Sequence, residues 1–120
     1  MAATKAMTPA LLERIAEQFR ALGEPSRLKL MQLLFAGECT VGELVSASGL
    51  SLANVSKHLG MLHQTGWVTR RKAGTAVVYA LGDPRAAALC DLMCARVRER
   101  AEAEAELTAA PAAPAARRKR

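Results

Sequence analysis

The two cysteines Cys90 and Cys94 have the most evident chemistry in this sequence of 120 residues. A spacing of four residues places both sulfur atoms on one face of a helix. Two thiolates so arranged can hold a soft ion such as As(III), Sb(III), Cd(II) or Hg(II), with Cys39 or a cysteine of a second copy as third ligand. The same thiols can react with an oxidant or a persulfide. The residues also leave an alternative open, in which the cysteines are small apolar side chains that pack at a contact between helices.

A second group of polar residues lies near the start of a predicted helix, from about Leu52 to Thr65. Apolar residues recur on one face of this helix at helical spacing, and the opposite face carries small or polar side chains. Asparagine can pair with adenine, and lysine with guanine or phosphate, so this face is suited to base edges. An amphipathic surface helix has the same periodicity. The candidate DNA-binding residues are Ser51, Ala53, Asn54, Ser56, Lys57 and His58.

This helix is the second of a predicted helix-turn-helix pair. The motif T-x-x-E at Thr40–Glu43 is a capping box, and it opens a short helix that ends near Ala47. A turn containing glycine follows at 48–51. In such a pair, the second helix can lie in the major groove of DNA.

A predicted β-hairpin follows directly. Its strands are 67–71 and 75–81, and its turn is 72–74. A hairpin in this place is the wing of a winged helix. Its end carries basic residues where a wing reaches phosphates or the minor groove, which favours a DNA contact over a solvated loop: Arg70, Arg71 and Lys72.

Three further helices are predicted, at about 8–23, 24–36 and 83–106. Hydrophobic residues make up 51% of the chain but aromatic residues only 3%, which suits a core of aliphatic side chains between helices. We therefore expect a mainly α-helical winged helix-turn-helix domain over 8–107, in the order four helices, two strands and a final helix. The ends at 1–7 and 108–120 are predicted to be disordered.

The net charge of +6 fits a polyanionic partner, but residues 117–120 are all basic and carry four of these charges. This tail predicts only a weak, nonspecific affinity for nucleic acid. No run of 18 apolar residues and no signal-peptide core is present, so we expect a cytoplasmic protein without membrane contact. No motif of a catalytic centre occurs, and we expect no enzymatic activity.

The sequence resembles the ArsR/SmtB family of bacterial winged-helix repressors, over about residues 10–100. The resemblance implies a homodimer joined through the first and last helices. It also implies that the dimer binds an inverted repeat in double-stranded operator DNA and leaves it when an inducer binds, with no cofactor required. The matching motifs are A-L-G-E-P-S-R-L-K-L-M-Q-L-L (21–34), T-V-G-E-L (40–44), L-S-L-A-N-V-S-K-H-L (50–59), the hairpin (67–81) and the D-P start of the last helix.

The sequence departs from the family's sensor motifs. Thr40 and Gly42 occupy the two positions at which a thiolate metal site often has cysteines. A separate departure lies on the predicted recognition helix, where Leu52 stands in place of a frequent glutamine. Both histidines, His58 and His63, lie on the predicted recognition helix rather than on the last helix, which argues against a zinc, cobalt or nickel sensor. Metal or redox sensing is therefore assigned to the cysteines: Cys90, Cys94 and Cys39.

A different class of function remains open at this point. A winged helix can also be a nonspecific DNA-binding protein or a protein-interaction module without an inducer. A selective footprint that survives moderate salt discriminates between these classes, because nonspecific binding weakens steeply as salt rises.

Overall fold

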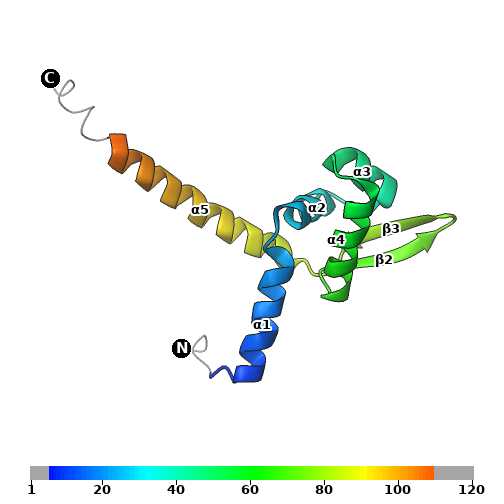
Figure 1. The fold of residues 1–120 in the computed structure, drawn as a ribbon, viewed down its shortest axis with the longest axis horizontal. Coiled ribbons are helices and arrows are strands. Elements are labelled where there is room, and N and C mark those ends of the chain that lie inside the picture. The colour runs from blue at the N-terminus through cyan, green and yellow to red at the C-terminus, as the bar shows by residue number, and fades with distance from the viewer. Residues whose placement is uncertain (1–5, 110–120) are drawn as a thin grey trace. The chain divides into compact units, whose positions relative to one another are not determined.

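The computed structural model describes residues 6–109 and divides the chain into two units, one up to Asp83 and one from Pro84. The second unit contains a single helix, α5 (Arg85–Ala109). The predicted disordered ends lie mostly outside the described residues, although Thr108 and Ala109 still belong to α5. The first unit has seven elements (Figure 1): α1 (Pro9–Leu22), α2 (Pro25–Phe35), β1 (Cys39–Thr40), α3 (Val41–Ser48), α4 (Leu52–Gln64), β2 (Val68–Ala73) and β3 (Ala76–Leu81).

Three helices begin at the caps that the sequence predicts. The hydroxyl of Thr8 accepts a hydrogen bond from the Leu11 N–H at 3.1 Å at the start of α1. At α3, the Thr40 hydroxyl accepts from the Glu43 N–H at 3.1 Å, and the Glu43 carboxylate accepts from the Thr40 N–H at 2.8 Å. The Ser51 hydroxyl caps α4. Each cap satisfies N–H groups that have no partner within their helix.

The turn between α3 and α4 depends on Gly49. Its φ of +76° lies in the left-handed region, where a side chain would be strained. From there its N–H donates to the Val45 carbonyl at 3.2 Å, and the Leu50 N–H donates to the Ser48 hydroxyl at 3.1 Å. Two helices can therefore follow each other with only three residues between them.

The sheet has one strand more than the sequence predicts. The two-residue strand β1 pairs with β3, so the strand order is β1-β3-β2, with both pairings antiparallel. A strand this short shows no alternation of apolar and polar residues, and only its tertiary pairing defines it. The hairpin strands reach Ala73 and resume at Ala76, so the predicted turn at 72–74 is wrong by about two residues. The three basic residues consequently lie along β2 rather than at the tip.

The core of the first unit forms where α2, α3 and α4 pack against the sheet. The buried arc of α2 is formed by residues 30, 31 and 34. Leu28 lies outside this arc, about 160° from residue 30 around the helix axis, and is 41% exposed. The buried apolar residues of this unit are Ala21, Leu22, Leu30, Met31, Leu34, Leu44, Val55, Leu59, Leu62, Trp67, Val68, Val78 and Tyr79.

Two helices, one in each unit, carry large apolar side chains that remain exposed. On α1 these include Leu12 and Phe19, which are 50% and 58% exposed. On α5 they are Leu89, Leu92, Met93, Val97 and Leu107. Within residues 6–109, no helix combines the length and apolar character that crossing a membrane requires.

Two leucines of α4 provide a matched test of this core. Leu59 is fully buried, whereas Leu52 on the same helix is 60% exposed. We expect Leu59→Ala to lower the free energy of unfolding by about 2–5 kcal/mol, because it removes buried methyl groups and leaves a cavity. Leu52→Ala should change it by no more than about 0.5 kcal/mol. Urea unfolding of both variants measures the difference, and equal effects would contradict this packing.

A second prediction concerns Glu24, which caps α2 by accepting a hydrogen bond from the Arg27 N–H at 2.9 Å. This bond is the main reason why the pKa of the Glu24 carboxyl is lowered; desolvation opposes it, and the charge of Arg27 adds to the lowering. A carboxyl whose pKa is lowered by folding stabilises the protein above its unfolded pKa, and that stability is lost as the pH falls through the folded value. Glu24→Gln should therefore make the free energy of unfolding fall less between pH 7 and acidic pH. Unfolding curves over this pH range, with Glu13→Gln on exposed α1 surface as control, measure it; parallel losses in Glu24→Gln and the unmodified protein would refute the assignment.

Candidate nucleic-acid interface and thiol pair

The helix α4 separates apolar from polar residues almost as the sequence predicts. Val55, Leu59 and Leu62 are completely buried. The small and polar residues of the other face are exposed, and the Ser51 hydroxyl accepts from the Asn54 N–H at 3.1 Å. The first half of α4 thus presents an amide and an ammonium group to solvent, together with the exposed side chain of Leu52. The exposed candidates are Ser51, Ala53, Asn54, Ser56 and Lys57.

His58 is not part of this exposed face, so the prediction that its side chain faces outward is wrong. Only 7% of the residue is exposed. Its Nδ1 lies 3.2 Å from Nη1 of Arg27, and its Nε2 lies 3.9 Å from the carboxylate of Glu24. Residue 58 follows Val55 by three positions and precedes Leu62 by four, so helical geometry carries it inward with them. This spacing was the signal in the sequence that could have shown the burial.

The basic residues of β2 divide between the two faces of the strand. Arg70 lies opposite Tyr79 and Lys72 opposite Val77, so these two cations share a face, whereas Arg71 lies opposite Val78. All three basic residues are exposed, and Arg71 forms an ion pair with Glu38.

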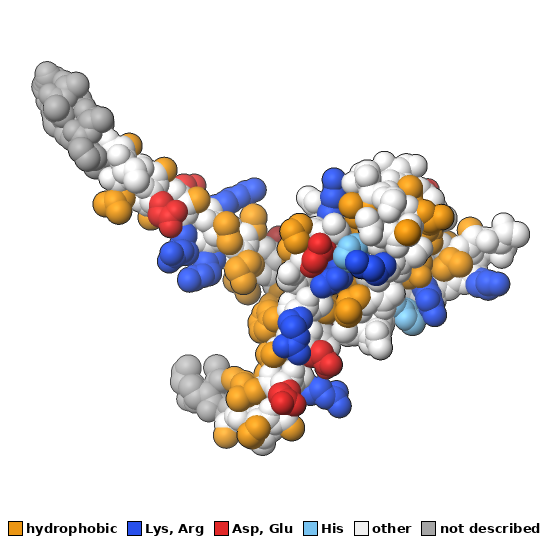
Figure 2. All heavy atoms as spheres, in the orientation of Figure 1, with side chains coloured by type: hydrophobic (Ala, Val, Ile, Leu, Met, Phe, Trp, Pro, Cys, Tyr) orange, Lys and Arg blue, Asp and Glu red, His pale blue; other side chains and the backbone are white. Residues whose placement is uncertain are grey.

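A groove of about 420 Å³ runs beside these cations, and Val41, Val77 and Tyr79 complete its lining. Figure 2 shows Lys and Arg side chains along the hairpin. The hairpin can therefore offer cations to a polyanion.

The cysteines lie in different units. Cys90 is half-buried and Cys94 is exposed, four residues apart on α5. Cys39, half-buried on β1 of the first unit, donates its S–H to the Gly37 carbonyl at 3.6 Å. Among residues 6–109, no three His, Cys, Asp or Glu side chains come together as a ready set of metal ligands. Within α5, the structure therefore brings together two thiols and no third ligand.

Burial affects the protonation of two of these thiols. Desolvation raises the pKa of both Cys39 and Cys90, and the carboxylates of Glu43 and Asp91 respectively add to the effect. Both thiols are consequently protonated at neutral pH. A metal ion must displace the proton to bind, so its affinity for Cys90 will rise with pH.

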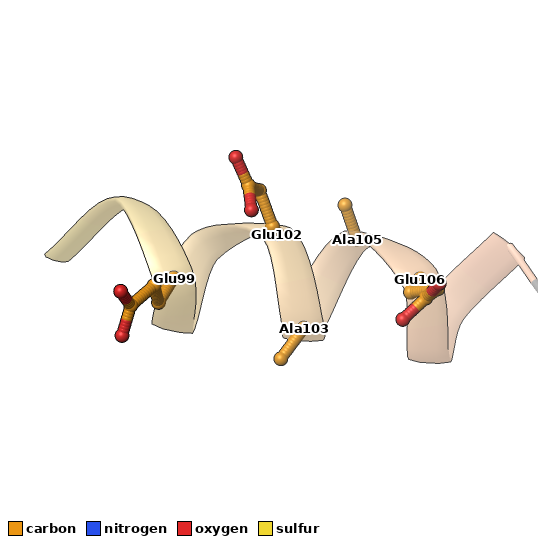
Figure 3. Close-up of a pocket in the computed structure, with 5 residues that line it drawn as sticks. All are labelled: Glu99, Glu102, Ala103, Ala105 and Glu106. Atoms are coloured by element: carbon orange, nitrogen blue, oxygen red, sulfur yellow. The ribbon is translucent and has the colours of Figure 1, made fainter. Parts of the chain in front are cut away.

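A hollow on α5 lies beyond the cysteines and has a different chemistry. Figure 3 shows its lining, which consists of Glu99, Glu102, Ala103, Ala105 and Glu106. All five residues come from two turns of one exposed helix, so the hollow is open surface between acidic side chains. It encloses no ligand site.

Comparison with known proteins gives a consistent result for the first unit. Residues 24–70, which include α2, α3, α4 and the start of β2, match the family described as bacterial regulatory protein, arsR family. A probable mercury resistance operon repressor of Streptomyces lividans is 46% identical over 74 residues, which cover 62% of this chain and 59% of that protein. The chain thus spans less than two thirds of the length of this relative.

Two further proteins extend the similarity over most of their own length. The biofilm growth-associated repressor of Xylella fastidiosa is 33% identical over 89 residues, which cover 71% of this chain and 78% of that protein. A solved homodimeric winged helix-turn-helix DNA-binding domain of Mycobacterium bovis has a TM-score of 0.72 and 31% identity, and the match covers 85% of this chain and 94% of that one. The fold is therefore a winged helix-turn-helix, and the chain belongs to the arsR family of bacterial regulatory proteins.

Proposed function

We propose that this protein is a transcriptional repressor that binds an operator inverted repeat as a homodimer and leaves it when its cysteines bind a thiophilic ion. The observation that carries the proposal is the division of α4. The apolar stripe of Val55, Leu59 and Leu62 is fully buried. Asn54 and Lys57 stand exposed in the first two turns of the helix. A helix held so firmly by one face can present the other to a DNA groove.

The base contacts follow from the chemistry of these side chains. The Asn54 amide can pair with N6 and N7 of adenine, and the Lys57 ammonium with O6 and N7 of guanine or with a phosphate. Ala53 and Ser56 are small enough to let the helix approach the base edges. The cations of β2 supply phosphate contacts that fix the position of the protein on the duplex.

The exposed apolar residues of α1 and α5 support dimerisation. Side chains such as Phe19 and Leu92 are 58% and 72% exposed, and such surfaces are typical of sites that a partner covers. The Mycobacterium bovis domain is described as homodimeric. A two-fold dimer would present two copies of α4 to successive major grooves, about 34 Å apart.

The two thiols of α5 support a soft ion as inducer. Cys90 and Cys94 lie one helical turn apart, and thiolates select such ions. The relative named as a mercury resistance repressor favours Hg(II) as the first ion to test. As(III), Sb(III), Cd(II), oxidants and persulfides belong to the same proposal as alternative inducers, with Cys39 as a further ligand. Binding at α5 would release DNA by favouring a dimer whose two α4 helices no longer fit both half-sites.

The DNA contacts can be tested on α4 itself. We expect Asn54→Ala and Lys57→Ala each to weaken operator binding by roughly 5- to 150-fold, because a specific base contact contributes about 1–3 kcal/mol. Gln64→Ala, an exposed change at the other end of the same helix, should leave the affinity unchanged. Fluorescence anisotropy with the sequence upstream of the gene, at two salt concentrations, measures all three variants. Unaltered binding by the first two variants, or binding that simply collapses with salt, would favour a nonspecific DNA-binding or protein-interaction module instead.

The inducer site can be tested by removing its thiols. The double variant Cys90→Ser/Cys94→Ser should bind operator DNA normally but remain bound when Hg(II) is added, because serine does not provide a soft ligand. Cys39→Ser, examined in parallel, shows whether the third cysteine is needed. Gel-shift titrations with Hg(II), As(III), Cd(II) and a persulfide donor identify the class of inducer. Release of the double variant at the same concentrations as the unmodified protein would rule out these two thiols.

A further inference from the structure

The side chain of Arg27 connects three helices of the first unit. It extends from α2, and its Nε donates to the Ala21 carbonyl at 2.6 Å while Nη2 donates to the Arg20 carbonyl at 3.1 Å. Both carbonyls belong to the last turn of α1. The remaining nitrogen, Nη1, lies 3.2 Å from Nδ1 of the buried His58 on α4. One guanidinium group therefore joins the end of α1 to the predicted recognition helix.

The contacts to α1 complete the cap of that helix. The last carbonyls of a helix have no partner within it. Two of them are satisfied by the backbone, since the Gly23 N–H donates to Phe19 at 2.8 Å and the Glu24 N–H donates to Leu22 at 2.9 Å. The carbonyls of Arg20 and Ala21, which lie between Phe19 and Leu22, accept hydrogen bonds from the Arg27 guanidinium group. A positive charge at this end also complements the helix dipole, so the guanidinium is held firmly in place.

The contact to α4 defines the state of His58. A guanidinium group only donates hydrogen bonds, so Nδ1 of His58 must accept, and the proton of the neutral ring is on Nε2. That N–H faces the Glu24 carboxylate at 3.9 Å. The ring is therefore held between two charged groups of the α1–α2 junction, in one tautomer.

A second contact joins α1 to the other end of α4. The Gln18 side chain of α1 donates to the carbonyl of Thr65, the C-cap residue of α4, at 3.3 Å. Together with the contact at His58, this bond fixes α4 against α1 at two points about two turns apart along α4. Two points define the direction of a helix axis, whereas one point leaves the helix free to pivot.

We propose that Arg27 and His58 are positioning residues that set the orientation of α4 against α1, and through it the affinity for DNA, without touching DNA. The inference rests on the proposed function and adds a route for its regulation. The exposed apolar residues of α1 include Leu12 and Phe19, so α1 is a helix on which a partner can act. Any displacement of α1 pulls on the Arg27–His58 contact and turns the polar face of α4.

The test replaces His58 by two residues of similar size, of which only one provides a hydrogen-bond acceptor for Arg27. His58→Leu keeps the apolar volume but removes the acceptor, and it should weaken operator binding about tenfold. His58→Asn puts an amide oxygen close to the position of Nδ1, and it should restore the affinity to within about threefold of the unmodified protein. Arg27→Lys cannot make all three contacts, and its effect should largely disappear in the His58→Leu background, because both changes remove the same contact.

Two measurements distinguish positioning from stability. Urea unfolding gives the folded fraction of each variant, and amide hydrogen exchange reports the opening of α4. A loss of affinity no larger than the loss of folded protein would overturn the inference. Nitrogen NMR of His58 should show the proton on Nε2 in the DNA-free protein, and the opposite tautomer would likewise overturn it.

The Lys57→Ala variant separates this inference from the proposed function. If Lys57→Ala weakens operator binding and His58→Leu does not, the positioning role is wrong while DNA recognition stands. If neither variant alters binding, the proposed function itself fails, and the positioning role fails with it.

Discussion

The burial of one face of α4 is the constraint on which the rest of the first unit depends. Val55, Leu59 and Leu62 are fully enclosed by α2, α3 and the sheet, and each contributes a few kcal/mol of hydrophobic free energy at most. These three residues lie on one stripe of the helix. Their burial therefore holds α4 against the core and also determines the direction in which its opposite face points. The Gly49 turn holds the start of the helix, and the bond between Gln18 and Thr65 holds its end. The exposed face is thus a consequence of the core.

The positive charges of the folded part lie on surfaces that the packing of the core leaves exposed. Most of the net positive charge of the chain lies in its last four residues, yet cations also stand where the fold exposes them, on α4 and on β2. Ion pairing moderates this surface, since Arg71 is bound to Glu38 and Arg27 is turned inward to His58 and the end of α1. The cations that remain available to a polyanion are therefore fewer than the composition suggests. This favours a contact that depends on a few well-placed side chains over one that depends on total charge.

The starts of three helices could be predicted from the sequence, because each depends on a hydrogen bond between residues only three positions apart. Thr8, Thr40 and Ser51 cap helices because each hydroxyl reaches an N–H three residues ahead, and this can be read from neighbouring residues alone. The strand β1 could not be predicted, because it consists of two residues that pair with β3 nearly forty positions later. The burial of His58 does not follow from its residue type, because a polar residue on a predicted recognition helix is expected to face outward. Its partners are Arg27 of α2 and Glu24, the N-cap residue of α2. The exposure of the candidate residues was thus predicted correctly where residue type and helical period agree, and incorrectly where a distant partner reverses the expectation.

The protonation of the thiols bears on the proposed function, because thiophilic ions and oxidants differ in how they react with a protonated thiol. The pKa of Cys90 is raised by burial and by the Asp91 carboxylate, so little of its reactive thiolate is present at neutral pH. Oxidants react with the preformed thiolate, and a raised pKa therefore slows them. A thiophilic ion differs, because the bond that it forms with sulfur itself drives out the proton. Cys94, one turn further along α5 and exposed to solvent, gives such an ion an accessible first ligand. Under the proposed function, the raised pKa of Cys90 therefore favours a soft ion over an oxidant as the inducer.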